Sequence, residues 1–152
     1  MCKKASILVV DDDPSIRKVL TAILEEKGYT VETAENGRDA IRRSKTRFYN
    51  LALIDIRLPD MEGVKLLTEM KETKPKMAKI IITGYPSLQN AVEALNKGAD
   101  AYIIKPLDID KTLATIEEHL EKQRKAQKMT EESLVDFIET RVKLLEHEKI
   151  AR

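Results

Sequence analysis

Several short apolar runs in this sequence end directly in a polar residue with the chemistry of a reactive site. These residues are Asp11, with Asp12 and Asp13 behind it, and then Asp55, Thr83 and Lys105. Carboxylates that share one cleft raise one another's pKa and destabilise the fold unless a cation neutralises them. Mg²⁺ suits that task, because it takes oxygen ligands and is commonly held by one or two carboxylates together with phosphate oxygens.

The same set of residue types fits phosphoryl transfer. A carboxylate can act as a nucleophile and become an aspartyl phosphate. A metal ion and the Lys105 ammonium would then stabilise the charge on the oxygens of the transferring group. The Thr83 hydroxyl could bond a phosphoryl oxygen. The residues therefore predict a site for Mg²⁺, with Mn²⁺ as the alternative ion, beside an aspartate that carries phosphate.

Repeated elements must bring these residues together. Short apolar runs alternate with amphipathic stretches, and a fully apolar run of this length is typical of a strand covered on both faces. Five such strand-helix units predict an α/β fold, (βα)5, with a parallel sheet and helices on both faces. The strands are expected at 7–10, 30–34, 51–54, 79–82 and 101–104, and the helices at 14–27, 37–45, 64–71, 88–96 and from Asp108.

The polar residues follow four of these five strands. Ligands of parallel α/β sheets bind at the carboxyl ends of the strands. If the sheet forms, Asp11, Asp55, Thr83 and Lys105 converge on one edge although they are far apart in the sequence.

Three segments closely resemble the receiver domains of response regulators from two-component systems. They read VVDDDPSIRKVL, LALIDIRLPDMEGVKLL and IIITGYPSLQNAVEALNKGADAYIIKPLD. The resemblance covers about residues 5–122. It implies a doubly wound, CheY-like (flavodoxin-like) five-stranded sheet in the order 2-1-3-4-5.

The resemblance also implies a role for each matching residue. Asp55 is the phosphoacceptor and a metal ligand, and Asp12 is a second direct ligand. Asp11 would bind the ion through water, and the backbone carbonyl of Arg57 would supply a further oxygen. The remaining implied roles are a switch hydroxyl at Thr83, an aromatic switch at Tyr102, a phosphate-binding cation at Lys105 and a cis peptide bond at Lys105-Pro106.

A function follows from this resemblance. A sensor histidine kinase would donate a phosphoryl group to Asp55, and the domain would be a regulatory phosphoacceptor rather than an enzyme with an external substrate. Phosphorylation would switch a partner-binding or homodimer surface formed by the helix at 88–96, the strand at 101–104 and the helix after Asp108. An alternative is that the chain is the receiver fragment of a larger transcriptional regulator.

A rival enzyme reading is a phosphohydrolase of the haloacid dehalogenase type. Asp11 and Asp13 fit the D-x-D motif of that class, but the threonine expected two residues further on is absent. Asp13 has a simpler structural interpretation, because it precedes Pro14 as an N-cap precedes a proline at the first helical position.

The C-terminal part extends beyond the receiver pattern. We divide the chain into a receiver domain at 1–122 and a helical extension at 123–152. Residues 121–129 have no apolar stripe and predict either a polar continuation of the preceding helix or a linker. Thr130 is expected to be the N-cap of a sixth helix to about Lys149. That helix would pack on its own domain, or would act in dimerisation or output coupling.

Composition argues against a nucleic-acid-binding, membrane-spanning or secreted protein. The 27 basic and 26 acidic residues nearly cancel, so we expect no direct contact with nucleic acid. No apolar run approaches the ~18 residues of a membrane span, and the start of the sequence does not have the layout of a secretory signal. The single cysteine, Cys2, cannot form an intramolecular disulfide, which fits a reducing, cytoplasmic location.

Overall fold

The protein folds around one five-stranded parallel sheet. The computed structural model describes residues 5–151, so Cys2 lies outside the described residues. The strand order is β2-β1-β3-β4-β5, which confirms the expected CheY-like topology. The strands are β1 (Ser6–Val10), β2 (Thr30–Ala34), β3 (Leu51–Asp55), β4 (Ala78–Thr83) and β5 (Ala101–Ile104).

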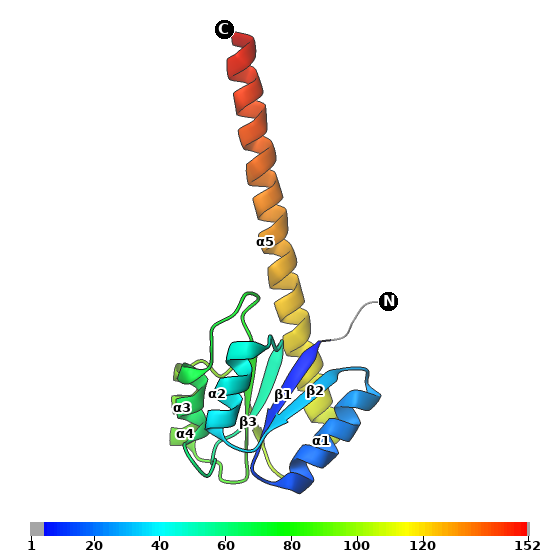
Figure 1. Cartoon of the computed structure of the whole chain (residues 1–152), viewed down its shortest axis with the longest axis vertical. Coiled ribbons are helices and arrows are strands. Elements are labelled where there is room, and N and C mark those ends of the chain that lie inside the picture. The colour runs from blue at the N-terminus through cyan, green and yellow to red at the C-terminus, as the bar shows by residue number, and fades with distance from the viewer. Residues whose placement is uncertain (1–4, 152) are drawn as a thin grey trace.

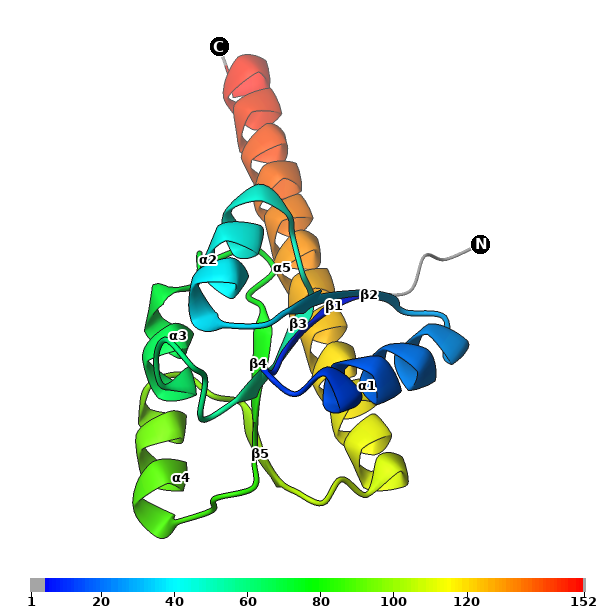
Figure 2. The same ribbon diagram turned by 60° about the horizontal axis from the view of Figure 1, so that its bottom comes forward.

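Helices cover both faces of this sheet (Figures 1 and 2). Figure 2 shows α1 and α5 on one side of the strands and α2, α3 and α4 on the other. Apart from the end of α5, the element boundaries differ from the sequence-based ones by at most two residues. The helices are α1 (Pro14–Glu26), α2 (Gly37–Thr46), α3 (Gly63–Glu69), α4 (Leu88–Asn96) and α5 (Ile109–Ala151).

Two apolar cores result from the alternation of side chains along the central strands. In β1, Ile7 and Val9 join the core under α1 and α5. Leu8 and Val10 point the other way and join the core under α2, α3 and α4. Successive strand residues face opposite sides of a sheet, so an entirely apolar strand is what two covered faces require.

The predicted cap of α1 is present. The Asp13 side chain accepts a hydrogen bond from the backbone N–H of Ser15 at 2.8 Å, and Pro14 takes the first helical position. Asp13 is thereby engaged in starting the helix, as its structural interpretation predicted. Asn36 and Ser87 cap α2 and α4 in the same manner.

The expectation of a separate sixth helix at Thr130 was wrong. α5 runs without a break from Ile109 to Ala151. The Thr130 hydroxyl donates to the carbonyl of Ala126 at 3.0 Å, so this side chain bonds back within a helix instead of capping a new one. The physical reason is that residues 121–129 contain no glycine or proline and consist mainly of strong helix formers.

One glutamine marks the place where α5 leaves the domain. The Gln123 amide donates to the backbone carbonyls of Asn50 at 2.8 Å and Lys76 at 2.7 Å, and accepts from the Asn50 side chain at 3.0 Å. Asn50 directly precedes β3 and Lys76 lies just before β4, so this contact is at the amino-terminal edge of the sheet. Beyond Gln123, α5 projects away from the domain, as Figure 1 shows in orange and red.

Candidate functional site

Three carboxylates meet at the carboxyl-terminal edge of the sheet. Asp11 and Asp12 follow β1, and Asp55 ends β3, which is the neighbour of β1. Each offers a carboxylate oxygen, and these oxygens lie within 4.8 Å of one another. Asp11 and Asp55 are buried, with 3% and 8% exposure, whereas Asp12 is exposed. The predicted convergence of these acids is therefore present in the fold.

Lys105 supplies a positive charge to the same cluster. It follows β5, the edge strand next to β4, and its Nζ lies 3.0 Å from Oδ2 of Asp11 and 3.4 Å from Oδ2 of Asp55. The Lys105-Pro106 peptide bond is cis, as expected. The backbone N–H of Lys105 donates to the carbonyl of Thr83 at 2.7 Å and holds this turn against the end of β4.

Burial and charge change the acidity of the cluster. Burial raises the pKa of Asp55, and the nearby charge of Asp11 raises it further, while the Arg57 backbone N–H and Lys105 counteract this rise. Burial alone would lower the pKa of Lys105, but its hydrogen bond to Asp11 and the charges of Asp11 and Asp55 raise it. The cluster holds three carboxylates, and the Lys105 ammonium pairs with two of them, so negative charge is in excess.

Two contacts that the sequence reasoning missed fix the acidic loop after β1. The Arg17 guanidinium donates to the Asp11 backbone carbonyl at 2.7 Å, and the Asp13 backbone N–H donates to the Asp11 carboxylate at 2.9 Å. Arginine near a helix N-terminus is opposed by the helix dipole. Arg17 in the first turn of α1 was thus a signal that the side chain has a specific partner.

A glycine lies directly behind Asp55. The Gly63 backbone N–H donates to the Ile56 carbonyl at 2.8 Å. A Cβ atom at position 63 would come within 2.2 Å of the Asp55 backbone oxygen and 2.9 Å of the Ile56 Cα. No local pattern in the sequence indicates this contact. The absence of a side chain at Gly63 lets the start of α3 pack against the strand that carries Asp55.

The loop between β3 and α3 is anchored to a second helix. The two carboxylate oxygens of Asp60 accept from the backbone N–H groups of Gly37 and Arg38, both at 2.9 Å. These groups begin α2, where backbone N–H groups lack partners within the helix. The bonds lower the pKa of Asp60, although burial acts in the opposite direction. The loop that follows Asp55 is therefore held by Asp60 on α2 and by the bond between Gly63 and Ile56.

Thr83 and Tyr102 lie one and two strands away from Asp55. Ile82 is the register partner of Asp55, so Thr83 follows at the same edge. Thr83 is fully buried, and its hydroxyl accepts from the Tyr85 backbone N–H at 2.9 Å. The Tyr102 ring packs against the core under α2, α3 and α4, and its buried hydroxyl has no hydrogen-bond partner among the residues that the structure describes.

Arg57 and Tyr85 form a stacked pair beside these residues. The Arg57 guanidinium carbon lies 3.9 Å from the centre of the Tyr85 ring, which is a cation–π contact. The Arg57 backbone N–H donates to Oδ1 of Asp55 at 3.3 Å. The stacking joins the loop after β3 to the loop after β4.

The donor set fits a hard divalent cation. The three clustered groups are all carboxylates, and Mg²⁺ prefers oxygen ligands. The uncompensated negative charge and the raised pKa of Asp55 are also what a bound cation would relieve. Asp12 and Asp55 are the residues that would hold the ion directly, with Asp11 behind them.

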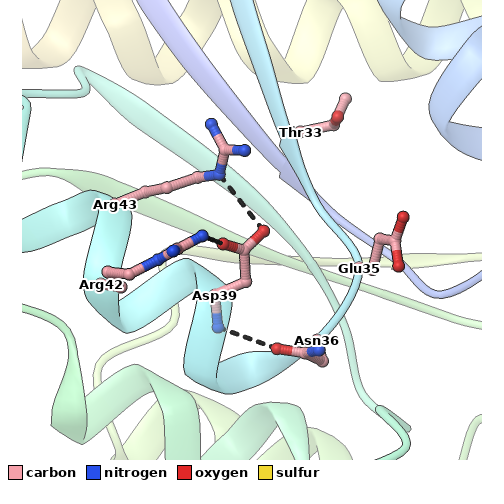
Figure 3. Close-up of a pocket in the computed structure, with 6 residues that line it drawn as sticks. All are labelled: Thr33, Glu35, Asn36, Asp39, Arg42 and Arg43. Carbon is pink, nitrogen blue, oxygen red and sulfur yellow. Dashed lines mark hydrogen bonds and ion pairs between the residues drawn. The ribbon is translucent and has the colours of Figure 1, made fainter.

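A cavity of about 330 Å³ lies elsewhere, beside the start of α2 (Figure 3). In Figure 3 Arg42 and Arg43 both reach toward Asp39, and the Arg43 Nε lies 3.2 Å from that carboxylate. The Asp39 backbone N–H donates to the Asn36 side chain at 2.8 Å. The charged groups of Asp39, Arg42 and Arg43 in this cavity pair with one another, so we assign it no ligand.

Comparison with known proteins gives one consistent result. The family model of the response regulator receiver domain matches residues 7–117. A response regulator receiver domain protein (CheY-like) from Methanospirillum hungatei JF-1 has a similar structure, with a TM-score of 0.77 and 47% identity. That similarity covers 80% of this chain and 98% of the other.

Two transcriptional regulatory proteins of Escherichia coli are similar to this chain over part of their length. The chain is 45% identical over 114 residues to ZraR of strain O157:H7, which covers 75% of this chain and 26% of ZraR. It is 35% identical over 143 residues to GlrR of strain K12, which covers 94% of this chain and 32% of GlrR. The chain thus spans about a quarter to a third of these relatives.

Proposed function

Because the chain belongs to the response regulator receiver domain family, we propose that it accepts a phosphoryl group on Asp55 from a sensor histidine kinase, in an Mg²⁺-dependent step. One observation supports this most strongly: the buried Asp55 carboxylate lies 3.4 Å from Lys105 Nζ and within 4.8 Å of two further carboxylates. A receiver domain is a regulatory phosphoacceptor, so the chemistry takes place on the protein itself.

In the proposed step, a carboxylate oxygen of Asp55 attacks the phosphorus of a phosphohistidine. The new bond is a P–O bond, and the P–N bond to the histidine breaks with its electron pair leaving on the imidazole. Lys105 would release its contact with Asp55 and pair with a phosphoryl oxygen, while its 3.0 Å contact with Asp11 keeps it in place. A bound Mg²⁺ would neutralise charge on the phosphoryl oxygens.

Phosphorylation would then be transmitted through Thr83 and Tyr102. We propose that the Thr83 hydroxyl exchanges its bond with the Tyr85 N–H for a phosphoryl oxygen. Tyr102 is suited to respond, because a buried hydroxyl without a partner is costly and so can favour a different packing. If two packings of the Tyr102 ring differ little in free energy, both are populated, and phosphorylation of Asp55 can shift the equilibrium between them.

The responding surface is the face formed by α4, β5 and the start of α5. It exposes several large apolar side chains, which we propose meet an output partner: Leu88, Val92, Leu95 and Ile104. The relatives are transcriptional regulatory proteins. Control of a transcriptional output through this surface, from a cytoplasmic location, is the corresponding proposal for this chain.

The phosphoacceptor assignment is tested with small phosphoryl donors. Acetyl phosphate with Mg²⁺ should add the mass of one phosphoryl group to the full-length protein, and peptide mapping should locate it at Asp55. Asp55→Asn keeps the size of the side chain but removes the nucleophile, so it should remain unmodified. Equal labelling of wild type and Asp55→Asn would show that another residue accepts the group.

The metal assignment is tested with Asp12→Ala. Asp12 is exposed and close to two other carboxylates, so its removal costs little packing and relieves repulsion. We expect at least a tenfold weaker affinity for Mg²⁺ in a calorimetric titration. The free energy of unfolding without Mg²⁺ should stay within about 0.5 kcal/mol of wild type or rise. A collapse of the melting temperature would make Asp12 a structural residue.

A further inference from the structure

The outer half of α5 exposes an apolar face that no described residue covers. After Gln123 every described side chain as far as His147 is exposed. Helices isolated in water are marginal even when their residues favour helix, because most helical stability in proteins comes from packing. Seven exposed side chains form this face, which we call the outer apolar face: Leu134, Val135, Phe137, Ile138, Val142, Leu144 and Leu145.

The outer apolar face lies on the same side of α5 as the face that packs on the domain. Leu134 lies 18 residues after Ile116, and Ile138 lies 18 residues after Leu120. At about 3.6 residues per turn this spacing is close to five full turns. Ile116 and Leu120 pack into the core of the domain. The outer apolar face is therefore the continuation of the core-facing stripe beyond the edge of the domain.

This position restricts what can cover the face. A second α5 placed parallel on that side would carry its own core-facing half into the space that the domain occupies. A second α5 that runs in the opposite direction can lie over residues 134–145 with its own domain at the far end of the pair. Along α5 the domain ends at Gln123, which is hydrogen-bonded to the amino-terminal edge of the sheet.

We propose that the outer apolar face binds the same face of a second copy of this chain in an antiparallel helix pair, with the two receiver domains at opposite ends. The apolar positions of 134–145 support a second copy as the occupant. They occur as doublets, Leu134-Val135 and Phe137-Ile138, followed by Val142 alone and then Leu144-Leu145. When residues 134–145 are counted from the C-terminal end, apolar residues fall at the same positions as when they are counted from the N-terminal end. The one exception is Arg141, which corresponds to Ile138.

Such a pattern is what a symmetric antiparallel contact needs. In a two-fold interface, residue i of one copy meets residue j of the other, and j meets i. Leu134 then faces Leu145 of the second copy, Phe137 faces Val142, and Ile138 faces Arg141. The arginine stem can lie along apolar surface while its guanidinium reaches water.

The described part of α5 fits this arrangement. If the pair is centred between Glu139 and Thr140, Lys128 of one chain is opposite Ala151 of the other, the last described residue of α5. At about 1.5 Å per residue, Ala151 then lies about 8 Å along the helix from the level of Gln123 in the other copy.

The first test is the oligomeric state of the full-length protein, without a phosphoryl donor, by light scattering over a range of concentrations. We expect a dimer that Ile138→Glu with Leu145→Glu converts to a monomer. Lys143→Glu is the matched control, because it changes the net charge by as much as the double variant. Lys143 is exposed, five residues after Ile138 and two before Leu145, which puts it on the other side of α5, so this variant should leave the dimer intact. A wild-type monomer, or a dimer that the double variant leaves intact, would overturn the proposal.

The second test measures the direction of the pair. A spin label at Gln127→Cys, in a Cys2→Ser background, should report a distance of about 40 Å between labels in the antiparallel dimer. A parallel pair would bring the labels near the interhelical spacing of about 10 Å and would overturn the antiparallel arrangement. Neither test involves Asp55, so their outcome is independent of the proposed phosphorylation.

Discussion

Asp55 is a buried carboxylate whose surroundings satisfy it only in part. It accepts from the Arg57 backbone N–H at 3.3 Å and pairs with Lys105 at 3.4 Å, but it also faces the carboxylate of Asp11. Buried charges without full compensation are costly. That residual cost is what a metal ion bound among the acids would lower.

At the same scale, the position of Asp55 depends on the missing side chain of Gly63. Gly63→Ala would place a Cβ 2.2 Å from the Asp55 backbone oxygen, and backbone cannot yield as a flexible side chain can. We expect a loss of about 1–3 kcal/mol in the free energy of unfolding and slower phosphorylation by acetyl phosphate. Chemical denaturation and the rate of phosphorylation measure the two effects.

Gly84→Ala is the control for that substitution. A Cβ at Gly84 would lie 3.9 Å from a Lys105 side-chain carbon, which is ordinary van der Waals contact. Its stability should stay within about 1 kcal/mol of wild type. If both glycine variants lost the same stability, the close approach behind Asp55 would not be the cause.

At the scale of elements, a buried tyrosine between α2 and β3 takes part in a polar cluster with β2 and α2. Tyr49, which is 2% exposed, donates its hydroxyl to Glu32 of β2, and Arg43 of α2 and Arg47 pair with the same carboxylate. Burial raises the pKa of Tyr49 from 10.0 to about 12, the bond to Glu32 and its charge add to this effect, and the two arginines oppose it. The folded protein thus favours the neutral tyrosine.

The sign of the pH dependence follows from that shift. Unfolded Tyr49 loses its proton near pH 10.0 and folded Tyr49 near pH 12, so its contribution is complete below pH 10.0 and is lost as the pH rises through about 12. We expect wild type to be more stable than Tyr49→Phe at pH 8, by about 1 kcal/mol for the lost hydrogen bond. That advantage should shrink above pH 10. A difference that stays constant from pH 8 to 12 would contradict the shift.

At the scale of the whole molecule, the acidic cluster and the outer half of α5 lie at opposite edges of the sheet. The acids follow the carboxyl ends of the strands, whereas Gln123 contacts residues just before β3 and β4. α5, with 43 residues, crosses the domain between these edges. The start of α5 is also part of the proposed output surface, so one continuous helix joins that surface to the outer apolar face.

Truncation after Ala126 separates the two parts. This shortened chain keeps Gln123 with its bonds to Asn50 and Lys76 and loses the outer apolar face. We expect phosphorylation by acetyl phosphate to keep its rate, because the acidic cluster is untouched, and self-association through α5 to disappear. Mass spectrometry and light scattering measure these outcomes. Loss of phosphorylation would show that the outer half of α5 supports the site.

The sequence by itself determined the fold class and the candidate site. Apolar runs such as 7–10 and 51–54 indicate strands covered on both faces, and polar residues directly behind them must lie at the carboxyl edge of a parallel sheet. Asp13 and Pro14 marked the start of α1 because capping depends on neighbours in the chain. These inferences held because each rests on local periodicity or on a rule for parallel sheets.

Only the tertiary structure decided the contacts between distant segments. Arg17 on the Asp11 carbonyl, Asp60 on the start of α2, and Gly63 against Asp55 each join parts of the chain whose distance no local pattern encodes. The continuity of α5 depends on local sequence, but the sequence led to the wrong prediction at Thr130. A threonine can cap a helix or bond back to a carbonyl within one, and Thr130 does the latter. The direction of the outer apolar face follows from the sequence and the tertiary structure together. The spacing of its residues can be read from the sequence, but which side of the domain it continues depends on where Gln123 fixes α5 against the sheet.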